Sequence, residues 1–305
     1  MGGEHGVEQG VVRDFPAGGL GSRARAWLDG DAEVRRHQEP RYAATVQLVR
    51  DAAVSWVADD ETSCGVEVFM LRRVASMAFA PRMMVFPGGG VDPRDADPAL
   101  VADHWAGPSP AAWAQRMACS EDVAQQLVVA AVREVFEECG VLLAGPDADS
   151  MVADVRDADW HADRVALEAR ELSFTELLRR RGLVLRSDLL SYRAHWVTPE
   201  FEPRRYDTAF FAALLPVGQV PDDATSEADA AGWWRPTDVL AGAADGSVLM
   251  LPPTIVALEQ LAVASSSASF VAETPEVWSI SSDLVEDEQG RIWMRARVPD
   301  TGAVP

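Results

Sequence analysis

The sequence of 305 residues contains no lysine, so all 27 of its basic side chains are arginines. This absence excludes chemistry that needs a lysine amine: the phosphate-binding loop of P-loop nucleotidases, Schiff bases and the attachment of pyridoxal phosphate. A compositional bias of the source genome explains the absence equally well, but the exclusion holds in either case. What remains is the planar guanidinium group, which suits the recognition of phosphate oxygens.

Cysteines and long apolar runs are also scarce. Cys64, Cys119 and Cys139 are widely spaced and form no CxxC pair, so neither a zinc site nor a disulfide framework is indicated. No apolar run approaches the ~20 residues that a membrane helix needs. Neither end shows a signal core or an address tag. We therefore expect a cytoplasmic protein with no membrane partner.

Positive charge is in short supply, because 48 acidic residues stand against the 27 arginines and give a net charge of −21. A surface this negative repels phosphate backbones, so no nucleic-acid partner is expected. The hydrophobic fraction of 48% is enough to bury a sizeable core. The length allows one large domain or two small ones.

Apolar periodicity and capping signals predict the order of strands and helices. Strands are expected over 41–51, 66–73, 82–92, 141–144, 189–199, 204–216 and 230–236, and helices over 121–139, 150–182 and 252–262. Their irregular alternation favours an α/β domain with a mixed sheet. We expect residues 1–38 to form an N-terminal lead-in, 39–265 the main domain, and 266–305 a C-terminal extension that contains a hairpin.

The stretch "VREVFEECGV" at 132–141 carries the strongest chemical signal. Its simplest interpretation is a solvated helix face with ion pairs between residues four apart. Glu134, Glu137 and Glu138, however, place three carboxylates on one side of a helix, where they repel one another. Mg²⁺ or Mn²⁺ would relieve that repulsion and bridge to a phosphate oxygen. Such an ion activates a water molecule for in-line attack on phosphorus.

Residues 133–141 resemble the second half of the Nudix box, whose every fixed position they satisfy. "FPGG" at 86–89 resembles the usual lead-in, and Gly89 with Asp95 fits the first half with a shorter acid. The resemblance implies a Nudix-type α/β/α sandwich with a mixed sheet. It also implies a pyrophosphohydrolase that uses Mg²⁺ or Mn²⁺ bound by the three glutamates.

The spacing between the two halves departs from the Nudix pattern. Arg133 follows Asp95 by 38 positions, where the family has eight, so some 30 residues are inserted. This arrangement resembles the Nudix branch of peroxisomal coenzyme A diphosphatases, as do residues 194–211 and 251–262. We expect the insertion, about 96–119, to be a surface excursion outside the core. Because it can carry Asp95 away from the helix, Asp95 is not counted among the ligands.

The resemblance also assigns roles around the glutamates. Arg133 is expected to hold one of the carboxylates in place rather than to bind metal. Gly88 and Gly89 are expected to let the backbone pass close to the metal and the phosphates. Glu227, on a loop before the strand at 230–236, is a candidate further ligand or general base. The alternative interpretation is that Glu227 is a solvent-exposed side chain in an acidic loop, without a role in the site.

Arginines near the glycine turn are candidate contacts for the diphosphate. Arg72, Arg73 and Arg82 flank the turn, and Arg204 and Arg205 open a strand. Guanidinium groups in such places suit pyrophosphate oxygens. They suit surface ion pairs equally well.

The leading functional hypothesis is metal-dependent hydrolysis of a nucleoside-diphosphate-linked small molecule, with coenzyme A or acyl-coenzyme A as the first candidate. One alternative is hydrolysis of NADH, ADP-ribose or a nucleotide sugar. Another is a non-catalytic Nudix module that binds a nucleotide and regulates a partner, although such a module need not keep all three carboxylates. A homodimer is left open.

Overall fold

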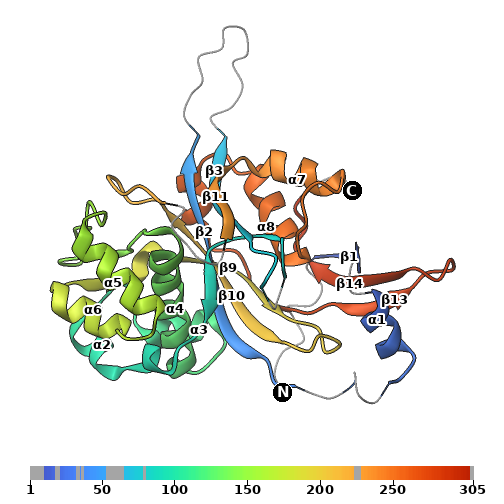
Figure 1. Cartoon of the computed structure of the whole chain (residues 1–305), viewed down its shortest axis with the longest axis horizontal. Coiled ribbons are helices and arrows are strands. Elements are labelled where there is room, and N and C mark those ends of the chain that lie inside the picture. Colours follow the sequence, from blue (N-terminus) through green and yellow to red (C-terminus); the bar gives the residue numbers. More distant parts are fainter. Residues whose placement is uncertain are drawn as a thin grey trace, which may run out of the picture.

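The computed structural model describes residues 10–17, 21–31, 35, 38–52, 65–77, 80–222 and 228–302. Its centre is one mixed sheet, with the short strands β4 (Met84–Val85) and β5 (Gly88–Gly90) attached to β3 and β2 (Figure 1). The order across the sheet is β11 (Ala228–Trp234), β3 (Val66–Arg73), β2 (Arg41–Asp51), β10 (Tyr206–Leu214), β9 (Ser191–Val197) and β12 (Ser279–Ile280). β10 runs parallel to β2 and antiparallel to β9, which confirms the expected mixed sheet.

Both faces of the sheet are covered. Successive side chains of a strand point to opposite faces, so Leu48 of β2 joins one apolar cluster and Val49 the other. Phe211 and Phe210 of β10 divide in the same way. Strands buried on both faces read as continuous apolar runs, which is why these segments stand out in the sequence.

Helices form the two outer layers of the sandwich (Figure 1). One face is covered by α3 (Pro110–Met117), α4 (Glu121–Cys139), α5 (Ala158–Glu168) and α6 (Phe174–Arg181). The other face is covered by α7 (Pro236–Ala244), α8 (Pro252–Ala262) and α9 (Ser267–Ala272). The predicted α/β/α sandwich is confirmed. No helix among the described residues is both long and apolar enough to cross a bilayer.

Helix α4 begins and ends where the sequence predicts. The Ser120 hydroxyl accepts a hydrogen bond from the Val123 N–H and so caps the first turn. Gly140 ends the helix at φ +66°, a conformation that glycine adopts without steric penalty. These two caps fix the register of the helix and therefore the direction in which its glutamates point.

The insertion is part of the core, so its prediction as a surface excursion is wrong. It forms α2 (Pro98–Asp103), β6 (Trp105–Ala106) and α3. Leu100 and Trp113 are fully buried in the cluster that surrounds α4. β6 also pairs with β8 (Val184–Arg186) in a small separate sheet. The reason is that α4 is apolar on more than one side, and the inserted helices bury the sides that the main sheet leaves open.

Replacement of Leu100 by alanine therefore tests whether the insertion belongs to the core. The free energy of unfolding should fall by about 3 kcal/mol, because a large buried side chain is lost and a cavity remains. Chemical denaturation measures the change, with Leu249→Ala as the matched control at an exposed leucine. A loss below about 0.5 kcal/mol, the usual size of a surface substitution, would show that the insertion is peripheral.

Two further predictions need correction. Residues 141–143 form no strand; only Ala144 lies in one, the short β7 (Ala144–Gly145). The Gln219 side chain satisfies the Leu142 backbone instead, since its Oε1 accepts from the Leu142 N–H and its Nε2 donates to the Leu142 oxygen. The helix expected over 150–182 is divided into α5 and α6, and Arg170 between them has φ +58°.

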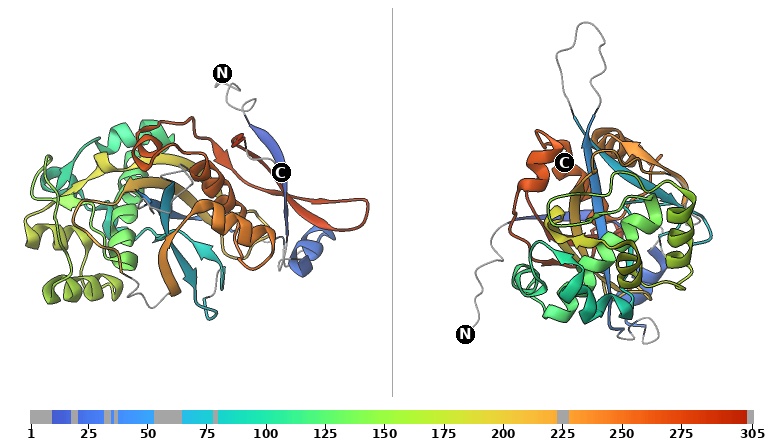
Figure 2. Two further views of the ribbon diagram at one scale, coloured as in Figure 1. Left: turned by 90° about the horizontal axis from the view of Figure 1, so that it is seen from above. Right: turned by 90° about the vertical axis from the view of Figure 1, so that its left-hand side faces the viewer.

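The two terminal segments meet in a second sheet (Figure 2). β1 (Val11–Pro16) pairs with β14 (Ile292–Val298), which also forms the expected hairpin with β13 (Asp283–Glu286). The Arg13 guanidinium donates two hydrogen bonds to the Glu259 carboxylate of α8. Strand β1 of the lead-in and strands β13 and β14 of the extension therefore form one unit, here called the terminal sheet, which packs on the α8 side of the molecule. The earlier part of the extension, α9 and β12, belongs to the main sandwich.

Candidate active site

A glycine strand lies directly against helix α4. β5 pairs with β2, opposite Thr45, and its first two glycines leave no room for a side chain. A Cβ on Gly89 would lie 2.5 Å from the Glu134 carboxylate carbon, and one on Gly88 would lie 2.4 Å from the Ala44 oxygen. Only glycine at positions 88 and 89 allows the strand to pass between β2 and the glutamates at this distance, whereas Gly90 has room for a Cβ.

The third glutamate is held by the same strand. The Gly88 N–H donates a hydrogen bond of 2.6 Å to Oε2 of Glu138. Glu138 is buried, with 7% of its surface exposed. The backbone amide and the burial together fix where this carboxylate lies.

Arg133 is the centre of a hydrogen-bonded cluster. Its Nη1 donates to Oε1 of Glu134 at 2.7 Å and to Oε1 of Glu137 at 3.2 Å. Its Nη2 donates to the Gly90 oxygen at 2.9 Å and to Oδ2 of Asp95 at 3.2 Å. One guanidinium therefore orients two box glutamates and ties the helix to the glycine strand.

Asp95 belongs to this cluster, although the insertion was expected to carry it away. It lies in a short 3-10 helix, Pro93–Ala96, and its carboxylate accepts from the Asp92 N–H in a capping box. The Gln125 amide of α4 donates to the Asp95 and Asp97 oxygens at 3.1 and 2.9 Å. These hydrogen bonds hold residues 95 and 97 against α4. The inserted segment therefore begins beside the helix, and Asp95 stays close to Arg133.

Burial shifts the charges of the cluster. It raises the pKa of Glu134 to about 7, against the opposing effect of Arg133. It also raises the pKa of Glu137 and of Asp95. Burial by itself would lower the pKa of the Arg133 guanidinium, but Glu134, Asp95 and Glu137 raise it above its ordinary value. The carboxylates thus outnumber the buried cation that faces them.

The donor set fits a hard divalent cation. No three Asp, Glu, His or Cys side chains within the described ranges converge in a metal-binding arrangement, since Arg133 holds two of the glutamates and Gly88 the third. Three carboxylates, those of Glu134, Glu137 and Asp95, nevertheless surround one guanidinium, and buried anions in excess require a positive partner. Oxygen-only ligands suit Mg²⁺ or Mn²⁺.

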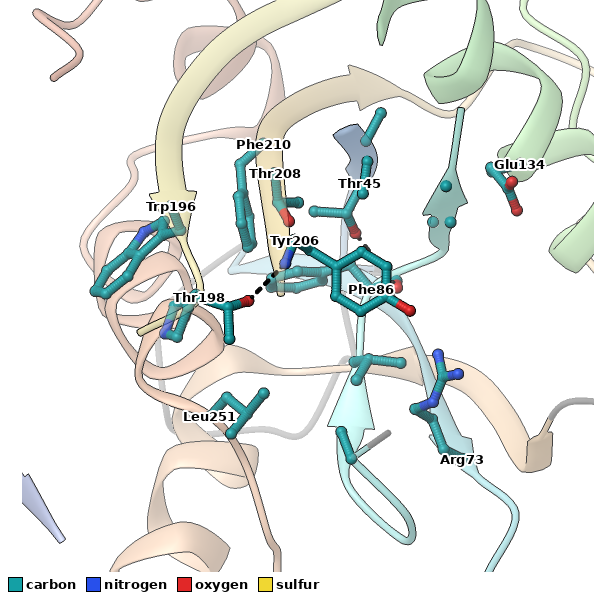
Figure 3. A pocket seen from close by; sticks show the side chains of 18 of the residues that line it. Thr45, Arg73, Phe86, Glu134, Trp196, Thr198, Tyr206, Thr208, Phe210 and Leu251 are labelled. Carbon is teal, nitrogen blue, oxygen red and sulfur yellow. Dashed lines mark hydrogen bonds between the residues drawn. The ribbon is translucent and has the colours of Figure 1, made fainter. Parts of the chain in front are cut away.

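The cluster opens into a pocket of about 660 Å³ with two chemically different ends. Glu134 and Glu137 line one end. The other is named here the apolar end. It is lined by Phe86, Trp196, Phe201, Phe210 and Met294, which belong to one apolar cluster, and by Leu251. Figure 3 shows Glu134 across the pocket from Trp196 and Leu251, with Thr45 and Tyr206 between them. A ligand that fills the pocket meets both ends.

The two neighbouring arginines of β3 point to opposite sides. Arg73 lines the pocket on the side of Glu134 (Figure 3). Arg72 does not line it; its side chain is half-exposed and forms an ion pair of 2.6 Å with Asp229. Arg94 and Arg170 also line the pocket. Sequence reasoning missed both, although the Asp92-to-Asp95 capping pattern next to Arg94 could have drawn attention to it.

The other candidate arginines do not line the pocket either. Arg205 is buried and donates to the Gln38 and Thr198 oxygens, so its guanidinium holds loops together. Arg82 adopts φ +61° in the turn between β3 and β4. Arg204 is exposed. The structure therefore gives none of these three a contact with the cavity that holds the glutamates. Glu227, the candidate base, lies outside the described residues.

Known proteins resemble this chain across the region that contains the site. The family model described as NUDT19 Nudix domain matches residues 40–261. "Putative nudix hydrolase 7" of Caenorhabditis elegans is 28% identical over 203 residues, which covers 64% of this chain and 55% of that protein. "Acyl-coenzyme A diphosphatase NUDT19" of Xenopus laevis is 25% identical over 228 residues, which covers 64% and 59%. The chain thus spans less than two thirds of the length of both relatives.

A solved structure agrees with the fold. The NUDIX hydrolase from Alicyclobacillus acidocaldarius superposes with a TM-score of 0.63 at 28% sequence identity. The match covers 78% of this chain and 98% of the other. The similarity extends over a complete second protein, so it concerns the whole arrangement of sheet and helices rather than the box alone.

Proposed function

The chain belongs to the Nudix hydrolases with a NUDT19-type domain, and from this premise we propose that it hydrolyses the diphosphate of coenzyme A or acyl-coenzyme A. The products would be 3′,5′-ADP and a phosphopantetheine, acylated when the substrate is. Relatives from Xenopus laevis and Gallus gallus carry the name acyl-coenzyme A diphosphatase at 25% and 24% identity. Identity this low supports the reaction class better than the substrate.

The observation that carries the substrate proposal is the pocket with one acidic and one apolar end. The glutamates suit a metal-bound diphosphate, and the apolar end suits what is attached to it. A pantetheine arm is a flexible chain with two amides and one hydroxyl, and an acyl group adds a thioester carbonyl and methylenes. NADH, ADP-ribose and nucleotide sugars would instead bring several ribose or hexose hydroxyls there, with a nicotinamide amide in the case of NADH. Burying those groups without partners costs free energy.

Each residue of the cluster has a separate role in the proposed hydrolysis. Nudix enzymes typically use a divalent metal, and Mg²⁺ or Mn²⁺ held by Glu134, Glu137 and Glu138 would offset diphosphate charge and acidify a water molecule. Arg133 orients Glu134 and Glu137 through its hydrogen bonds. The Gly88–Gly90 strand keeps side chains away from the phosphates. The role of Glu227 as general base stays a prediction from the sequence.

Arg73 is proposed to contact the diphosphate. Arg73→Gln should raise KM about tenfold with a smaller effect on kcat, since a charge-assisted hydrogen bond contributes roughly 1.5–3 kcal/mol. Arg72→Gln is the matched control, because its side chain points away from the pocket. Steady-state kinetics on the preferred substrate measures both. Equal KM values for the two variants would remove Arg73 from the site.

A hydrolysis screen tests the proposed function. The purified chain with Mg²⁺ or Mn²⁺ is incubated with coenzyme A, acyl-coenzyme A, NADH, ADP-ribose and a nucleotide sugar, and products are identified by mass spectrometry. We expect 3′,5′-ADP and the matching phosphopantetheine in equal amounts, from the first two substrates. Preferred turnover of another substrate would overturn the coenzyme A proposal. Binding without any turnover would favour the non-catalytic module.

A further inference from the structure

We propose that Met294, on strand β14 of the terminal sheet, closes the apolar end of the pocket and limits the size of the apolar tail that a substrate can carry. This inference rests on the proposed function, because it concerns the part of the substrate beyond the diphosphate. It assigns selectivity to a residue outside the stretch that matches the family, 40–261.

The terminal sheet reaches the same pocket as the Nudix box. Met294 and Ser282 both line it, although they follow the family-matched stretch. Met294 is 6% exposed and belongs to the apolar cluster that contains Trp196, Phe201 and Phe210. Two residues of the main sheet, one residue of the loop after β9 and one residue of the terminal sheet's central strand therefore share one wall of the apolar end.

The position of Met294 is fixed by its strand. Met294, Ala296 and Val298 alternate with exposed residues, so all three face inward. Met294 pairs with Phe15 of β1 on one side and with Leu284 of β13 on the other. Arg13 ties β1 to Glu259 of α8 through two hydrogen bonds. A strand held on both edges and anchored to a helix keeps this side chain in the pocket.

The N-terminal segment supports the same wall at a second point. Nε of Arg23, in α1 (Gly21–Leu28), donates a hydrogen bond of 2.7 Å to the Phe201 oxygen. Phe201 lies in the loop after β9 and lines the apolar end. Residues before and after the family-matched stretch therefore both position the apolar end of the pocket.

The chemistry of the wall points to an apolar tail as its ligand. Aromatic rings and a thioether offer dispersion contacts to methylenes. The four arginines that line the pocket, Arg73, Arg94, Arg133 and Arg170, are not among the residues of this wall. Methionine is unbranched and flexible, so it fills space that a shorter side chain would leave to the ligand. The volume at position 294 should thus set the preferred length of the tail.

Selectivity between coenzyme A and a series of acyl-coenzymes A, from butyryl to palmitoyl, tests the proposal. Met294→Ala should raise the ratio of kcat/KM for palmitoyl-coenzyme A over coenzyme A about tenfold, and Met294→Phe should lower it about tenfold. The first variant frees the space of about three methylenes and the second fills the space of about one. Val298→Ala is the matched control: it lies on the same strand and face, is fully buried and does not line the pocket. Its ratio should match that of the unaltered chain.

The proposal is overturned if both Met294 variants, folded by circular dichroism, keep the ratio within twofold. If Met294→Ala does not fold, the Met294→Phe arm decides alone. Failure of the proposed function would appear differently, as absence of turnover on every coenzyme A substrate. In that case calorimetry with palmitoyl-pantetheine, which lacks the diphosphate, decides: about tenfold weaker binding to Met294→Phe supports the apolar site, and unchanged affinity rejects it.

Discussion

Glu137→Gln is expected to lower turnover by about 100-fold or more while the fold remains intact. The substitution keeps the size of the side chain and can keep a hydrogen bond from Arg133, but it removes a negative charge from the donor set. A divalent cation then loses one of its carboxylates and binds less tightly. Turnover at saturating Mg²⁺, with circular dichroism to establish folding, measures the effect.

The control for this prediction lies on the same helix. Glu121 is exposed in the first turn of α4, so Glu121→Gln should leave turnover within about twofold. Glu138→Gln should behave like Glu137→Gln, because its carboxylate is held against the glycine strand by Gly88. Near-normal turnover in both Glu137→Gln and Glu138→Gln at saturating Mg²⁺ would show that the box is not the active site.

Arg133→Ala is expected to destabilise the fold by about 3–5 kcal/mol, because it leaves buried carboxylates without their cation. Its guanidinium donates to Glu134, Glu137, Asp95 and the Gly90 oxygen, and its side chain is 10% exposed. Urea denaturation in the absence of divalent metal measures the loss. Activity should also fall, since Glu134 and Glu137 lose the group that orients them.

The comparison variant for stability is Arg72→Ala, whose ion pair with Asp229 lies on the surface. Exposed pairs typically contribute less than about 1 kcal/mol. A loss for Arg133→Ala no larger than that for Arg72→Ala would mean that the carboxylates are hydrated, and that the cluster is not the tightly coupled unit described above.

Local patterns in the sequence determined the elements that contain the site. Strands at 41–51 and 66–73 and the helix at 121–139 begin and end at the predicted residues. Periodicity and caps suffice for these because their signals lie within one element. The box spacing likewise brought the three glutamates to one side of α4 before any packing was considered.

Contacts between distant residues could not be predicted from those patterns. Asp95 returns to Arg133 across 38 positions because Gln125 and a capping box hold it. The insertion lies in the core because α4 needs cover on several sides. Arg72 and Arg73 must point to opposite faces of β3, but only the packing of β3 against its neighbours decides which of them faces the pocket.

The terminal sheet is the clearest case of a feature decided by tertiary structure. The sequence of β1 is short and weakly patterned, and its pairing partner β14 lies near the other end of the chain. Such a strand is stabilised by its pairing with β14 and by the hydrogen bonds between Arg13 and Glu259. Neither of these contacts can be predicted from the residues of β1 alone. The sequence by itself therefore determined the family and identified the candidate catalytic carboxylates. The part of the apolar end that Met294 forms depends on the pairing of β1 and β13 with β14, and no local sequence pattern predicts pairing between strands so far apart in the chain as β1 and β14.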